Sequence, residues 1–197
     1  MKNNQPHFSH TCANGLKVIA EKKSHSSSIA LSLLVPIGAA YEKQDKKGSA
    51  NLLIDMLSKG AGKWNNVELS TQYEDIGVRK GFSSGIEVST FSMAMLPENF
   101  SKALSILRTN LLEPKLPESE LENVKSIAFQ DLKSIEDEPA SFVMKELVKE
   151  FYPSPHNSSQ IGSAKGIKNT KIEDLKNLYN DRFKPVSYTH LTLPTKA

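Results

Sequence analysis

Residues 48–60, Gly48-Ser49-Ala50-Asn51-Leu52-Leu53-Ile54-Asp55-Met56-Leu57-Ser58-Lys59-Gly60, carry apolar side chains at helical spacing. Ala50, Leu53 and Leu57 recur every three or four residues, which predicts an amphipathic helix. Gly60 supplies a stop signal at its end. The segment before it, residues 29–37, is almost continuously apolar and predicts a strand that is central in its sheet and covered on both faces.

Further strands are predicted on both sides of this pair. Asn14-Gly15 predicts a hairpin turn that is followed by a strand over residues 16–20. Ile86 and Val88 alternate in one phase, and Phe91, Met93 and Met95 alternate in the other. A single strand over residues 86–95 with a bulge near Ser89-Thr90 would explain this change of phase.

Proline residues mark the starts of several predicted helices in the second half of the chain. Helices are expected after Pro97, Pro117 and Pro139, and two others over residues 66–76 and 172–179. Strands followed by runs of helices predict an α+β fold, with a mostly antiparallel or mixed sheet and helices packed on one face.

Composition excludes several classes of function. The 197 residues include 25 basic and 22 acidic side chains, interleaved along the chain, for a net charge of +3. The chain has no basic stripe of the kind that indicates a nucleic-acid partner. It also has no run of about 20 apolar residues, which a membrane span would need. The single cysteine, Cys12, excludes an internal disulfide.

The C-terminal residues 186–197 resemble the translation of a transposase adapter used in sequencing libraries. Such a tail is excluded from reasoning about the fold. We therefore expect one domain over residues 1–185, truncated at its C-terminal end, followed by a non-natural tail over residues 186–197.

Several stretches, in this order, resemble the insulinase/pitrilysin-like metallopeptidases, whose members include the mitochondrial processing peptidases. The resemblance covers roughly Phe8 to Pro185 and rests on Ala13–Ile19, Val35–Glu42, Gly48–Gly60, Leu111–Pro117, Glu136–Pro139, Phe151–His156, Ile161-Gly162, Leu175–Tyr179 and Phe183–Pro185. It implies a metallopeptidase domain of the processing-peptidase type, corresponding to the family's N-terminal-type domain.

In that family a helical motif, His-x-x-Glu-His, supplies two zinc ligands and a general base, and a later glutamate completes the ligand set. The matching positions here are Asn51, Ile54, Asp55 and Asp131. All four residues differ from the motif. An amide and two short carboxylates are poor zinc ligands beside imidazole, and Ile54 cannot accept a proton. We therefore predict no catalytic residue, no cofactor and no bound metal in this chain, and treat these four positions as vestigial.

The resemblance implies a non-catalytic domain that pairs with a zinc-bearing homologous subunit or domain, as in a heterodimer, to enclose extended peptide substrates for proteolysis. Zinc is then expected only in the partner. The chain is then expected to be either the first domain of a separate subunit or the inactive half of a longer protease. We expect its location to be the bacterial periplasm or cytoplasm. Two alternatives stay open: a purely structural subunit of a larger assembly, and a metallopeptidase with an unusual metal site at Asn51, Asp55 and Asp131.

Overall fold

The computed structural model describes residues 7–23 and 25–183, so the expected adapter-derived tail lies outside the described residues. The chain divides into two compact units. The described part of the first is a hairpin of β1 (His7–Thr11) and β2 (Lys17–Glu21), joined in antiparallel register with Phe8 opposite Ala20. Gly15, with φ 85°, occupies the turn, which confirms the hairpin predicted at Asn14-Gly15.

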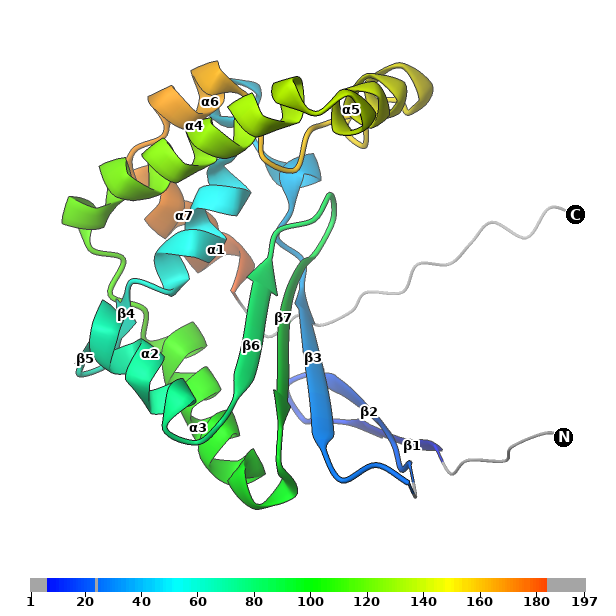
Figure 1. Cartoon of the computed structure of the whole chain (residues 1–197), viewed down its shortest axis with the longest axis vertical. Coiled ribbons are helices and arrows are strands. Elements are labelled where there is room, and N and C mark those ends of the chain that lie inside the picture. Colours follow the sequence, from blue (N-terminus) through cyan, green and yellow to red (C-terminus); the bar gives the residue numbers. More distant parts are fainter. Residues whose placement is uncertain (1–6, 24, 184–197) are drawn as a thin grey trace, which may run out of the picture. The chain divides into compact units, whose positions relative to one another are not determined.

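The second unit, residues 27–183, is built on an antiparallel sheet with the strand order β3-β7-β6 (Figure 1). Its strands are β3 (Ile29–Val35), β6 (Arg79–Ser83) and β7 (Ser89–Met95). Along β7 the side chains of Phe91, Met93 and Met95 are buried and those between them are less so. The sheet therefore has one covered face and one open face.

Helices supply the rest of this unit and cover one face of the sheet (Figure 1). They are α1 (Ser49–Leu57), α2 (Asn66–Glu74), α3 (Phe100–Leu112), α4 (Leu121–Asp137), α5 (Pro139–Phe151), α6 (Ala164–Asn169) and α7 (Ile172–Arg182). A two-stranded ribbon of β4 (Gly60–Ala61) and β5 (Trp64–Asn65) joins α1 to α2. The α+β prediction, with antiparallel strands, is confirmed.

The predicted helices are present, and their starts follow from local chemistry. Pro139 is the first residue of α5, where its missing N–H costs nothing. Pro97 and Pro117 lie at short 3-10 turns, η3 (Pro97–Asn99) and η4 (Glu118–Glu120), that lead into α3 and α4. Asn65 and Glu68 form a reciprocal capping box at the start of α2. None of the described helices is long and apolar enough to cross a membrane.

The prediction that residues 29–37 form a central strand covered on both faces is wrong for the described structure. β3 lies at one end of the sheet and pairs only with β7. Its side chains alternate between half-buried and exposed, and Leu34 keeps 58% of its surface exposed. Apolar composition does not determine how many neighbours a strand has, because strand order depends on distant segments.

The bulge predicted near Ser89-Thr90 is also absent from the structure. β7 begins at Ser89, and the preceding residues form a loop whose backbone bonds to another segment: Ala39 N donates to Gly85 O and Ala40 N to Ile86 O. The change of phase therefore marks the end of a loop and the start of a strand. β6 was not predicted, because Gly81 and two basic residues interrupt its alternation.

Candidate functional site

The start of α1 is held by the carboxylate of Glu42. One of its oxygens accepts a hydrogen bond from Gly48 N at 3.0 Å, and the other accepts one from Ala50 N at 2.7 Å. These are amides at the beginning of the helix, which have no partner within the helix itself. Burial raises the pKa of Glu42 to about 6, against the lowering effect of these bonds. Glu42 thus caps the start of α1, the helix with the motif positions.

The four motif positions do not share one environment. Ile54 is buried in the core with only 2% of its surface exposed, together with its neighbours Leu53 and Met56. Asn51 and Asp55 are half-buried and lie one helical turn apart, so they share a face of α1. Ile54, the residue that the resemblance matches to the family's general base, therefore packs in the core.

Asp131 of α4 approaches the same face of α1. The two helices pack together, and the negative charge of Asp131 is the second largest influence on Asp55. Burial first, and then Asp131, raise the pKa of Asp55 to about 6, while Lys59 opposes the shift. The structure thus brings Asp55 and Asp131 within electrostatic reach. The match of Asp131 to the family's later glutamate, made from its distance to Asp137 and Pro139, stays a prediction.

These residues do not fit the zinc centre that the resemblance implies. A hydrolytic zinc site has three protein ligands, usually with imidazole among them, and an open position for water. Asn51, Asp55 and Asp131 offer one amide and two carboxylates. Over residues 7–23 and 25–183 no group of three or more His, Cys, Asp or Glu side chains is placed to hold a metal ion. The assignment of Asn51, Ile54, Asp55 and Asp131 as non-catalytic positions stays a prediction, based on donor chemistry.

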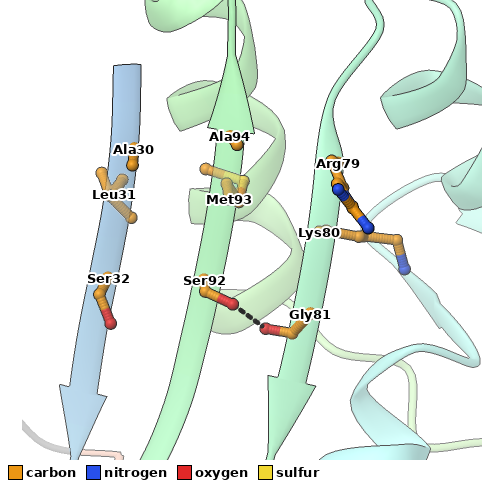
Figure 2. A pocket seen from close by; sticks show the side chains of 9 residues that line it. All are labelled: Ala30, Leu31, Ser32, Arg79, Lys80, Gly81, Ser92, Met93 and Ala94. Carbon is orange, nitrogen blue, oxygen red and sulfur yellow. Dashed lines mark hydrogen bonds between the residues drawn. The ribbon is translucent and has the colours of Figure 1, made fainter. Parts of the chain in front are cut away.

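A second candidate site is a cavity on the open face of the sheet, which the sequence did not predict. A shallow cavity of about 430 Å³ extends across β3, β7 and β6 (Figure 2). Small residues of the open face line most of it: Ala30, Ser32, Gly81, Ser92 and Ala94. Ser92 Oγ donates to Gly81 O at 2.9 Å across the two strands. Arg79 and Lys80 of β6 also line the cavity. In the sequence, the only signal for them was that two basic residues are adjacent, in a strand that was not predicted.

The family model described as insulinase, peptidase family M16, matches residues 17–164. The chain belongs to the insulinase family of peptidases. The match spans the hairpin strand β2, the sheet, α1 and α4, so the positions compared above lie inside it.

Relatives of this insulinase-family chain include two peptidase subunits. It is 24% identical over 168 residues to a probable mitochondrial-processing peptidase subunit beta of Arabidopsis thaliana, covering 85% of this chain and 32% of the relative. It is 27% identical over 149 residues to mitochondrial-processing peptidase subunit alpha-1 of Dictyostelium discoideum, covering 74% of this chain and 23% of the relative. The chain thus spans about a third or less of these relatives.

The fold is also that of a solved family member. A crystal structure of an M16 peptidase inactive domain from Pseudomonas fluorescens superposes with a TM-score of 0.80 at 20% identity, covering 88% of this chain and 43% of that one. This likeness confirms the metallopeptidase-type domain fold expected from the resemblance.

Proposed function

We propose that this chain is a non-catalytic insulinase-family domain that pairs with a zinc-bearing homologous subunit or domain and helps to enclose extended peptides for proteolysis. The observation that carries the proposal is the side-chain set on α1 and α4. Asn51, Asp55 and Asp131 replace the two histidines and the glutamate that bind zinc in the family. Ile54 replaces the general base and is packed in the core.

A chain without a base has little hydrolytic capacity even if a metal binds by chance. General acid–base catalysis contributes about 10²–10⁴ in rate, and an isoleucine supplies none of it. Asp55 and Asp131 match zinc-ligand positions of the motif and not the position of its base. Zinc chemistry in the proposed pair therefore belongs to the partner.

Pairing is supported by the names of two relatives, which are alpha and beta subunits of one kind of peptidase. Peptide binding is supported by the sheet, whose two outer strands, β3 and β6, each pair with β7 alone among the described residues. An extended peptide can add to such an edge through its backbone, which gives affinity without reading sequence.

Coexpression with a zinc-bearing homologue of the same organism tests the proposal. We expect the two chains to co-purify with zinc bound to the partner, and we expect peptide cleavage to exceed that of the partner alone. A matched control replaces the histidines of the partner's motif and should abolish cleavage in the pair. The proposal is wrong if the chains neither co-purify nor change the rate. Stable co-purification without peptide affinity would instead identify a purely structural subunit.

A further inference from the structure

β6 is an outer strand whose backbone is open on one side. Among the described residues, the backbone of Arg79–Ser83 bonds only to β7, and no turn, loop or helix donates to it or accepts from it. α1 packs against β6 on the covered face of the sheet, so this edge lies beside the helix that carries the motif positions. An edge with free N–H and C=O groups can accept one more strand.

Two cationic side chains occupy the first two positions of this edge. Figure 2 shows the side chains of Arg79 and Lys80 leaving β6 on the side away from β7. Neither forms an ion pair in the part of the chain that the structure describes; the four ion pairs found there involve other residues. A charged pair without carboxylate partners at an open strand edge is suited to an incoming anionic group.

The side chains of Arg79 and Lys80 lie in different environments. Arg79 is exposed on the open face of the sheet. Lys80 is half-buried on the other face, with Nζ 5.2 Å from the centre of the Tyr73 ring and 5.3 Å from that of Phe82. Glu74 acts on Lys80 through its charge without forming an ion pair with it. Arg79 is therefore the less compensated of the two cations.

The geometry points to acidic segments as the peptides that this edge prefers, with two consecutive Asp or Glu side chains opposite Arg79 and Lys80. This inference rests on the proposed function, because it assigns a substrate class to the peptide site. Successive residues of an added strand point to opposite faces of the sheet. One acidic side chain would thus meet Arg79 on the open face, and its neighbour would meet Lys80 on the covered face.

The edge of β3 has no charged side chains that could select a peptide by its charge. Its sequence, Ile29-Ala30-Leu31-Ser32-Leu33-Leu34-Val35, contains no charged residue. A peptide that added there would bind without regard to its charge. Charge preference therefore distinguishes addition to β6 from addition to β3.

Fluorescence anisotropy with labelled octapeptides of one β-prone background tests the inference on the full chain. One peptide carries a central Glu-Glu pair, one Gln-Gln and one Lys-Lys. We expect the Glu-Glu peptide to bind most tightly, by about two- to fivefold for each cross-strand charge pair, and this preference to shrink at high salt. Arg79→Gln should remove about half of the preference on a logarithmic scale. Arg108→Gln, which removes an exposed arginine from α3, should leave it unchanged.

A backbone-methylated Glu-Glu peptide separates strand addition from simple charge attraction. It keeps the charges but lacks N–H donors, so we expect it not to bind. Equal binding of the methylated peptide, or equal binding of Glu-Glu and Gln-Gln, would overturn the inference; the second result would leave the proposed peptide site standing. If none of the three unmethylated peptides binds, the proposed peptide site fails as well.

Discussion

Asp55 differs clearly from an ordinary surface carboxylate in its pKa. Its pKa in the folded protein, about 6, lies above the ordinary value of 3.8 because of burial and the charge of Asp131. The folded state therefore binds this proton more tightly than the unfolded state does. The contribution of Asp55 to the free energy of unfolding is most favourable below about pH 4 and declines as the pH rises towards about 6.

Asp55→Asn should stabilise the protein at neutral and higher pH. The amide is uncharged, so it avoids the cost of ionising a partly buried group, and we expect a gain of about 1–3 kcal/mol at pH 8. Urea unfolding at pH 8 and at pH 4 measures the gain, which should be much smaller at the lower pH. Asp137→Asn, at an exposed carboxylate of α4, serves as the control. A gain that is the same at both pH values would contradict the assigned cause.

Glu42→Ala should destabilise the protein by removing the acceptor for two amides of α1. Loss of such a cap leaves Gly48 N and Ala50 N without their partner and costs about 1–3 kcal/mol. Thermal or urea unfolding at pH 8 measures the loss. Glu136→Ala, an exposed position on α4, should change stability by less than about 0.5 kcal/mol. An equal effect of both substitutions would exclude a capping role for Glu42.

At the scale of elements, α1 and α4 together provide three side-chain positions at which a zinc site could be rebuilt. Asn51 and Asp55 lie one turn apart on α1, and Asp131 reaches the same face from α4. We expect the triple variant Asn51→His, Asp55→His, Asp131→Glu to bind about one zinc ion per chain, because two imidazoles and a carboxylate complete a three-ligand set. Metal analysis after dialysis measures this.

The rebuilt site should bind zinc without efficient hydrolysis, since Ile54 still occupies the position of the base. The control is the double variant Asn51→His, Asp131→Glu, which has a single histidine and should bind zinc much more weakly. Failure of the triple variant to bind more zinc than the double variant would show that α1 and α4 do not present these three positions to one ion.

α5 differs from α1 in having no buried residue. Val143, Met144, Leu147 and Phe151 each keep more than half of their surface exposed, whereas most side chains of α1 are buried. Helices with few buried contacts open at a lower free energy than the core does. Hydrogen exchange followed by mass spectrometry should show faster exchange in peptides from α5 than in those from α1. Equal protection of both helices would contradict this expectation.

The sequence predicted some elements much better than others, for physical reasons. All the described helices except the short α6 were found, because their apolar spacing and their prolines are local signals. The edge position of β3 was not, because it depends on pairing with β7, which lies more than 50 residues away along the chain. β6 was missed because Gly81 and two basic residues interrupt its alternation. At the site, the resemblance to the family motif pointed to Asn51 and Asp55, while the burial of Ile54 and the cap by Glu42 required the structure.

At the scale of the whole molecule, an insulinase-family fold is retained around a different set of side chains. The Glu42 cap and the buried side chains of α1 position this helix, whereas Asn51 and Asp55 are only half-buried. On the proposed function, this domain keeps its fold and its open sheet edge while the catalytic chemistry belongs to a partner. The chain covers 43% of the solved structure that it resembles.

The most direct test of the central claim is a paired measurement of zinc content and peptide hydrolysis on the purified chain, with and without a chelator. We expect far less than one zinc ion per chain and no hydrolysis that the chelator removes. One zinc ion per chain together with chelator-sensitive hydrolysis, abolished by Asp55→Asn, would contradict this expectation and would establish an active metallopeptidase with an unusual metal site.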